Sequence, residues 1–336
     1  MAQPLGFDEG RYLVIQQGAV AAGRALATEL VGARARGAEE LVFLGTGGVN
    51  LLMEPAIQLL AGHSRFAAHV RRPAEETLDG VQRLDSSSVV VLPSLSGTTA
   101  ETLQIAEQAR DQGAHLIALV GHDDTPLGDL CDTVLVNHAA DDTSSESYYL
   151  QTMIGILGLA DDPAAADLSR ELALLPELLV EVKQSYDATA ASHAEFIAAS
   201  PWHIFTAGGP SWTEAHYFAM CILEEMQWIR TRPVHAADFF HGTLELVEAG
   251  VSVVVLKDQS AHRALSDRVE KFLVGRTDVV DVIDTAEVAL PGLSPTASAV
   301  AGPIVLAAQL ERVAAHVEVL RDHPLTTRRY YKRVEY

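Results

Sequence analysis

The sequence predicts an α/β protein built from two parallel-sheet units in tandem. Three observations support this: short apolar runs alternate with helical patterns, glycine-rich or serine-rich turns follow several of these runs, and the order repeats in the second half. Strands that alternate with helices form right-handed crossovers and hence a parallel sheet. We expect each unit to hold a mainly parallel, five-stranded sheet flanked by helices, in domains spanning residues 1–165 and 166–336.

The first unit opens on a long helical pattern over residues 12–37. Leu41–Leu44 is an apolar run too short for a helix, and it meets the glycine turn Gly45–Gly48 before a second helical pattern. This is the order strand, turn, helix. Later strands are expected at 66–70, 89–92, 116–120 and 133–136, and helices at 100–112 and 145–159.

The second unit repeats this order. Aligning Val42 with Ile204 also places Val89–Leu92 opposite Val251–Val254, and Asp161-Asp162-Pro163 is the expected link between the copies. The residues of this half predict helices over 168–199, 212–229, 260–272 and 304–320, and strands over 203–206, 251–256 and 279–283.

Composition excludes several classes of protein. The 336 residues include 45 acidic and 24 basic side chains, a formal charge of −21, which argues against a basic groove for nucleic acid or an anionic membrane. The start of the chain lacks a secretory pattern, and no apolar stretch approaches the roughly 20 residues of a membrane span. Cys131 and Cys221 are the only cysteines, so no disulfide framework is expected. We expect a soluble cytoplasmic protein that binds neither nucleic acid nor membranes.

A hydroxyl-rich loop follows the strand expected at 89–92. It comprises Ser94, Ser96, Gly97, Thr98 and Thr99, directly before a helix. A helix N-terminus offers unpaired backbone N–H groups, glycine allows close approach, and hydroxyls add donors, so such a loop can hold a phosphate without lysine or arginine. The alternative is a loop that merely caps its helix. The corresponding loop of the second half begins Lys257-Asp258 and lacks this pattern, which predicts one phosphate site per chain.

Other cofactor motifs are missing. The turn Gly45-Thr46-Gly47 lacks the third glycine of a dinucleotide fingerprint, and no GxxxxGK[ST] motif occurs. No HExxH motif or comparable cluster supports a metal. We therefore expect no cofactor and no metal ion.

Two glutamates interrupt the apolar pattern over residues 219–229. Glu225 shares a helical face with Phe218 and Ile222, whereas Glu224 lies on a face with Met220 and Trp228, and helix geometry alone does not choose between the two carboxylates. A carboxylate in apolar surroundings has a raised pKa, which suits a general base near neutral pH. A buried salt bridge is the structural alternative.

A histidine follows in a turn before glycine. His241 precedes Gly242, and an imidazole there could carry a proton, although a capping or core role is the commoner one for an isolated histidine. His235 is a rival for the same role.

These pieces together resemble the double sugar isomerase (SIS) domain family. The matching residues are Ser94 to Thr102 and Glu225 followed sixteen residues later by His241-Gly242. The resemblance implies that the loop binds a sugar phosphate, that Glu225 rather than Glu224 moves a proton between sugar C1 and C2, and that His241 rather than His235 assists ring opening. It also implies a homodimer or larger homo-oligomer in which the histidine serves the neighbouring subunit.

A narrower resemblance is to the fructoselysine 6-phosphate deglycase branch. It lies in residues 225–229, 234–242 and the tail 323–331, and it extends over nearly the whole chain. It implies a deglycase acting on a 6-phosphofructosamine. Val49 stands where the family usually has a serine, which removes one hydroxyl. Further substrate contacts are expected from Thr46, Gly47, Ser144, Ser145 and Glu146.

Two alternatives remain at this level. One is an aldose–ketose isomerase or a glucosamine 6-phosphate deaminase, which would share the loop and the Glu225–His241 pair. The other is a non-catalytic phosphosugar sensor. The sequence does not identify the amino compound: an amino acid such as lysine or aspartate, a short peptide, a polyamine and an opine-like amine all remain open.

Overall fold

The computed structural model describes residues 3–79, 84–140, 145–331 and 333–335. It divides into two compact units. The first unit consists of Asp8–Glu177 with Gly292–Ala297, and the second of Leu178–Pro291 and Ser298–Tyr336 with Met1–Phe7. The boundary expected from the sequence, at residues 165 and 166, falls inside helix α7 (Ala164–Leu172).

The first unit contains a five-stranded sheet in which every pairing is parallel, in the order β2-β1-β3-β4-β5. This confirms the predicted sheet. The chain leaves β1 toward one edge and leaves β3 toward the other, so the direction of winding reverses between these two neighbours. The strands are β1 (Glu40–Leu44), β2 (Ala67–Arg71), β3 (Ser88–Ser94), β4 (His115–Val120) and β5 (Thr133–Val136).

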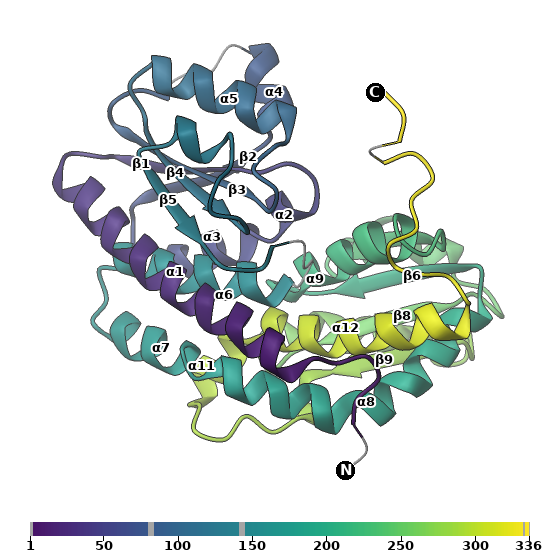
Figure 1. The fold of residues 1–336 in the computed structure, drawn as a ribbon. Coiled ribbons are helices and arrows are strands. Elements are labelled where there is room, and N and C mark those ends of the chain that lie inside the picture. Colours follow the sequence, from purple (N-terminus) through teal and green to yellow (C-terminus); the bar gives the residue numbers. More distant parts are fainter. Residues whose placement is uncertain (1–2, 80–83, 141–144, 332, 336) are drawn as a thin grey trace. The chain divides into compact units, whose positions relative to one another are not determined.

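Helices cover both faces of this sheet (Figure 1). On one face lie α1 (Glu9–Ala35), α3 (Glu54–Ala61) and α6 (Ser145–Ile156), and on the other α4 (Pro73–Asp79) and α5 (Ala100–Asp111). Because both faces are buried, the central strands are apolar over most of their length, as parallel strands of doubly covered sheets are. The shorter helical segments of this half are α2 (Gly48–Leu51), η1 (Gly128–Leu130) and η2 (Leu157–Leu159).

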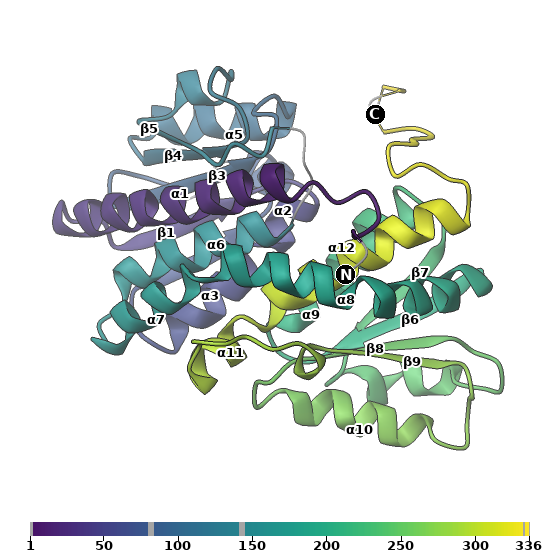
Figure 2. The same cartoon turned by 60° about the horizontal axis from the view of Figure 1, so that its bottom comes forward.

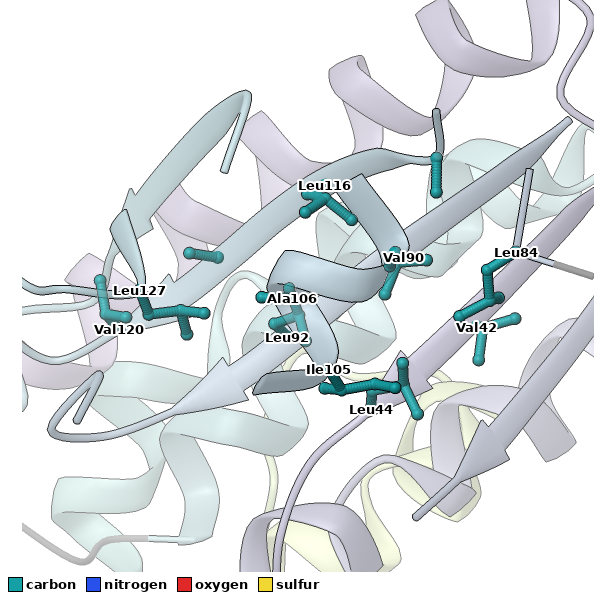
Figure 3. Packing of buried hydrophobic residues seen from close by; sticks show 13 residues of the cluster. Val42, Leu44, Leu84, Val90, Leu92, Ile105, Ala106, Leu116, Val120 and Leu127 are labelled. Carbon is teal, nitrogen blue, oxygen red and sulfur yellow. The ribbon is translucent and has the colours of Figure 1, made fainter. Parts of the chain in front are cut away.

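The core between α5 and the sheet contains fully buried aliphatic side chains (Figure 3). Ile105 and Ala106 of α5 pack against Val90 and Leu92 of β3. This packing fixes α5 on the strand that precedes it, and it therefore fixes the loop that joins them.

The second unit contains a four-stranded parallel sheet in the order β7-β6-β8-β9, so the expectation of five strands is wrong here. Strand β7 was not expected, because it lies at an edge, contains Pro233, and carries exposed arginines instead of an apolar run. The winding again reverses between two neighbours, β6 and β8. The strands are β6 (Trp202–Ala207), β7 (Arg230–His235), β8 (Val253–Lys257) and β9 (Val280–Asp284).

Helices also cover both faces of this second sheet (Figure 2). Helix α10 (Arg263–Leu273) lies on one face, whereas α9 (Ser211–Tyr217), α12 (Gly302–Leu320) and most of α8 (Leu175–Ala199) lie on the other. Of the helices the structure describes, none combines the length and apolarity needed to cross a membrane. The remaining elements are the π-helix η3 (Phe218–Glu224), the 3₁₀ segments η4 (Phe239–His241), η5 (Thr243–Leu246) and η6 (Thr285–Glu287), and α11 (Pro295–Val300).

Candidate active site

Two loops meet where the first sheet reverses its winding. They follow β1 and β3, which are parallel neighbours, so both loops lie at the same edge. Ligands of open α/β sheets bind in the crevice at such a reversal, beyond the carboxyl ends of the strands. The approach is close: the Oγ1 atoms of Thr46 and Thr102 are 3.3 Å apart, and a Cβ on Gly45 would lie 2.9 Å from the Pro93 ring.

The hydroxyl-rich loop has a defined internal geometry. The backbone N–H of Gly97 donates to Ser94 Oγ at 3.2 Å, and the hydroxyl oxygens of Ser96 and Thr98 are 2.9 Å apart. Gly97 has φ +61°, and a Cβ there would lie 2.5 Å from Thr125 Cβ. Only glycine fits this position, because the backbone is left-handed and the space beside it is filled.

The first turn of α5 is left available to an anion. Thr99 is the N-cap residue, but its side chain makes no capping hydrogen bond to the helix. The structure therefore does not support the capping alternative for this hydroxyl. Uncapped N–H groups at the start of a 12-residue helix attract negative charge, and the neighbouring hydroxyls can donate to the same group.

The further substrate contacts expected from the sequence lie in different environments. Thr46 is half-buried, and Gly47 has φ +65° with open space where a Cβ would be. Ser145 is buried, and the fully buried Glu146 accepts a hydrogen bond from the Tyr12 hydroxyl at 3.2 Å. Ser144 lies outside the described residues. These contacts with substrate remain predictions.

A buried carboxylate lies where the second sheet reverses its winding, between β6 and β8. Asp258, which follows β8, is buried; it accepts hydrogen bonds from Ser211 Oγ at 2.5 Å and from the Ser260 N–H at 2.8 Å. A hydroxyl and a backbone N–H that could have bound a phosphate are thus already satisfied. This arrangement supports the prediction of one phosphate site per chain.

The element carrying Glu225 departs from the expected helix. After α9 the chain widens into the π-helix η3, and backbone bonds from Glu225 to Met220 and from Gln227 to Ile222 span five residues. The helical face assumed from the sequence therefore does not exist. Trp228 then adopts φ +57°, a strained conformation for a bulky residue, before β7 begins. Widened turns and strained backbone are concentrated at functional sites.

Glu225 lines a pocket of about 920 Å³ in the second unit. Its side chain is 35% exposed, and Oε1 lies 2.9 Å from Nε of Arg328 in the C-terminal tail. Glu224 also lines the pocket, but its Oε1 accepts from both the backbone N–H and the hydroxyl of Thr231, at 3.2 and 2.6 Å. Glu224 thus fixes the turn into β7, whereas the partner of the Glu225 carboxylate among the described residues is a side chain from the tail.

The two histidine candidates also differ in exposure and in hydrogen bonding. His235 is half-buried; its Nδ1 accepts from the N–H of Ala237 at 3.1 Å, and its ring meets Trp212 edge-on. Burial lowers the pKa of His235, although Asp238 opposes that shift. His241 is exposed at the end of η4, and it is not among the described residues that line the Glu225 pocket. The structure therefore leaves His241 accessible and His235 engaged.

The described residues include no activated cysteine and no group of metal ligands. Burial raises the pKa of Cys221 to about 12, and nearby glutamates including Glu225 add to the shift. Burial likewise raises the pKa of Cys131 to about 12, so both thiols stay protonated at neutral pH. No group of three or more histidine, cysteine, aspartate or glutamate side chains in the described ranges could hold a metal ion.

Sequence reasoning missed the basic side of the pocket. Arg230, Arg321, Arg328 and Arg329 all line it, together with Trp228. Arg328 and Arg329 lie in the tail that carried the family resemblance, but no local pattern placed them beside Glu225. The available signal was an arginine pair in a chain where acidic residues outnumber basic ones by nearly two to one.

Comparison with known families now decides what kind of protein this is. A SIS domain model matches residues 36–157, the part of the first unit that contains both loops at the sheet reversal. Residues 36–157 of the chain therefore form a SIS domain.

Relatives of this SIS-domain protein extend the match beyond the first unit. It is 26% identical to the fructosamine deglycase FrlB of Bacillus subtilis over 89% of this chain and 93% of the relative. It is also 26% identical to the fructoselysine 6-phosphate deglycase of Escherichia coli, over 74% of this chain and 72% of the relative. Its homologues are thus SIS-family phosphosugar isomerases and deglycases.

Solved structures share the two-sheet architecture of this SIS-domain protein. A crystal structure of a Bacillus subtilis protein provisionally assigned as a phosphosugar isomerase superposes with a TM-score of 0.85 and 25% identity, covering 96% of this chain and 99% of the other. The C-terminal domain of glucosamine–fructose-6-phosphate aminotransferase from Francisella tularensis superposes with a TM-score of 0.76 and 16% identity, covering 95% and 98%. The double SIS-like fold is therefore established.

Proposed function

We propose that this SIS-domain protein is a deglycase that cleaves a 6-phosphofructosamine into glucose 6-phosphate and a free amine. The observation that carries the proposal is the placement of Glu225: an accessible carboxylate at the end of a π-helix, in a pocket large enough for a small ligand. Both named deglycase relatives act on sugar amines of this class, which supports the assignment.

The proposed mechanism uses only side chains of this chain. Ser94, Ser96, Thr98 and Thr99, with the backbone of Gly97, hold the sugar phosphate. His241 assists ring opening by moving a proton between the ring oxygen and the C2 hydroxyl. His241 is exposed and so accessible for this step, whereas Nδ1 of His235 already accepts from the Ala237 N–H.

Proton transfer by Glu225 then breaks the bond to the amine. Glu225 takes a proton from C1, the electron pair forms the C1–C2 double bond, and the C2 carbonyl π bond opens onto its oxygen, which takes up a proton to give an enaminol. The carboxylic acid returns a proton to C2 while the nitrogen loses its proton, which leaves an imine between C1 and nitrogen. Water adds to C1, the C–N bond breaks, and the products are glucose 6-phosphate and the amine. No electrons are gained or lost overall.

We extend the proposal to the assembly and its location. The protein acts in the cytoplasm as a homodimer or larger homo-oligomer, and His241 serves the site of the neighbouring subunit. The absence of His241 from the residues lining the Glu225 pocket supports a histidine supplied from elsewhere.

The test is release of glucose 6-phosphate, followed through a coupled dehydrogenase. A panel of 6-phosphofructosamines is compared with fructose 6-phosphate, with and without ammonia. We expect turnover of a fructosamine by the unchanged protein, and a loss of 10³-fold or more in Glu225→Gln, because the amide cannot accept the C1 proton. Glu224→Gln is the matched control and should keep most of the activity.

Other outcomes would redirect the assignment. Turnover of fructose 6-phosphate alone would make the protein an isomerase, and ammonia-dependent turnover would indicate a glucosamine 6-phosphate deaminase. Phosphosugar binding without turnover of any compound would mean a sensor, and it would leave Glu225 as a structural partner of Arg328.

A further inference from the structure

The pocket around Glu225 is basic, although the protein is strongly acidic. Its lining carries four arginines and two glutamates, in a chain whose formal charge is −21. A local excess of positive charge against the overall field attracts anionic ligands to this pocket. The phosphate is already assigned to the hydroxyl loop of the first unit, so these arginines remain for another anionic group.

Two of the four arginine side chains have neither an ion pair nor a side-chain hydrogen bond among the described residues. Arg328 pairs with Glu225, and Arg321 donates to the backbone oxygen of Gln227 at 3.3 Å. Arg230 and Arg329 form no ion pair in the part of the chain that the structure describes. These two guanidinium groups are therefore the ones available to an anionic ligand in the pocket.

The orientation of Arg329 is fixed. Its guanidinium carbon lies 4.0 Å from the centre of the Trp228 ring, a stacking contact that holds the planar group. The Trp228 ring is itself packed edge-on against His323, with ring centres 4.5 Å apart. A held guanidinium loses little entropy when it binds a carboxylate in the two-pronged geometry that arginine favours.

We propose that the amino part of the substrate is acidic and that Arg230 and Arg329 bind its carboxylates. The class is a dicarboxylic amino acid or an amine of similar negative charge, attached through its nitrogen to C1 of the phosphosugar. This inference rests on the proposed deglycase function. It assigns a substituent opposite in side-chain charge to the lysine named for the Escherichia coli relative.

The test compares substrates that differ in one charge. The 6-phosphofructosamines of glutamate and glutamine have nearly the same shape, and the lysine derivative reverses the charge. We expect kcat/KM for the glutamate derivative to exceed that for the glutamine derivative about tenfold, which is the effect of one charge-assisted hydrogen bond. The lysine derivative should be poorer still.

Variants then assign the preference to the two arginines. Arg230→Gln and Arg329→Gln should each lower kcat/KM for the glutamate derivative, and the variant of the arginine that binds the side-chain carboxylate should reduce the preference for glutamate over glutamine toward unity. The α-carboxylate is common to both derivatives, so the variant of an arginine that binds this group should lower kcat/KM for the two alike. Arg232→Gln is the control: Arg232 is exposed on the same strand, donates to Thr243 Oγ1, and does not line the pocket. It should keep the full preference, and thermal unfolding should show that all three variants fold.

The outcomes separate this inference from the proposed function. Equal turnover of the glutamate and glutamine derivatives, or a preference for lysine, would overturn the inference and leave the deglycase intact. An equal loss on all substrates, with weaker inhibition by fructose 6-phosphate, would show that the arginines bind the sugar phosphate, and this too would overturn it. If no fructosamine turns over, the proposed function fails, and calorimetric binding of the same compounds to the unchanged protein decides the inference alone.

Discussion

The conformation of the hydroxyl-rich loop depends on a single residue, Gly97. Its φ of +61° and the Thr125 side chain beside it both exclude a Cβ. We expect Gly97→Ala to weaken phosphosugar binding at least tenfold, because the loop must move to relieve the contact, and to destabilise the protein by more than the roughly 1–2 kcal/mol of a left-handed alanine alone. Calorimetric titration and chemical denaturation measure the two effects.

The variant Gly113→Ala distinguishes the cost of backbone strain from the cost of the steric contact with Thr125. Gly113 has φ +88°, but the nearest atom to its missing Cβ is 4.0 Å away. This variant should show the cost of strain only, with phosphosugar binding unchanged. Equal behaviour of the two variants would show that the Thr125 contact does not shape the loop.

His203 provides a second prediction at this scale. The residue is fully buried; one ring nitrogen meets Ser252 Oγ at 2.7 Å and the other the Ile197 oxygen at 3.0 Å. Burial lowers the pKa of His203, partly offset by its backbone bonds. The unfolded chain takes up a proton near pH 6.5 that the folded chain takes up only at lower pH, so this residue reduces stability as the pH falls below about 6.5.

Removing this titration should flatten the acid side of the stability curve. We expect His203→Gln to lower the free energy of unfolding at pH 7.5, because buried hydrogen bonds are lost. The further decrease between pH 7 and pH 5 should be smaller than in the unchanged protein. Urea unfolding at a series of pH values gives both quantities, and parallel curves for the two proteins would rule out a role for His203 in the pH dependence.

At the scale of elements, the position of α5 depends on its packing against β3. Leu92 is fully buried in the cluster that joins the two (Figure 3). Leu92→Ala should cost about 2–5 kcal/mol, the sum of lost burial and a cavity in a closely packed core. Leu78→Ala is the control, since Leu78 is 87% exposed on α4 and its loss should change stability by about 0.5 kcal/mol or less. Denaturation curves that place Leu92→Ala within error of this control would contradict the packing described here.

The elements that were predictable share one property, a burial pattern visible in the local sequence. Strand β5 was expected with its exact bounds, and α5 to within one residue, because apolar residues and glycine delimit them. Strand β7 and the π-helix η3 were missed. An edge strand carries no continuous apolar run, and the insertion of a π-turn depends on tertiary packing rather than on residue type.

The candidate site likewise has a part that the local sequence predicts and a part that it does not. The hydroxyl loop is contiguous in sequence, so its residues and their position before a helix could be predicted. Arg328 and Glu225 are a hundred residues apart, and only the folded tail brings them to 2.9 Å. Helix geometry alone did not choose between Glu224 and Glu225, whereas the family resemblance implied Glu225; the structure adds that Thr231 donates two hydrogen bonds to Glu224.

At the scale of the whole molecule, the two units are unequal copies of one plan. Each has a parallel sheet with a reversal of winding between two central strands. In the first unit this point has a hydroxyl-rich loop before a helix without a side-chain cap, whereas in the second the buried Asp258 carboxylate lies there. If the first unit binds the sugar phosphate as proposed, this difference explains why the second unit would not offer a second phosphate site.

The last prediction concerns how subunits share catalysis. If His241 serves the neighbouring subunit, Glu225→Gln and His241→Ala damage different halves of each site. In a mixed dimer, one site then carries both substitutions and the other carries neither. Refolding the two inactive variants together in equal amounts should restore about a quarter of the unchanged activity, because half of the dimers are mixed and half of their sites are intact.

Light scattering on the same sample should show the dimer or larger assembly that this explanation requires. Restored activity should also vanish when the two variants are purified and mixed without exchange of subunits. If co-refolded samples stay inactive while the assembly forms, His241 acts within its own chain, since every chain then carries a damaged site. A monomer with full fructosamine turnover would lead to the same conclusion, and His241 would have to reach the Glu225 pocket by a movement of η4 and the following Gly242, whose φ of +147° only glycine adopts readily.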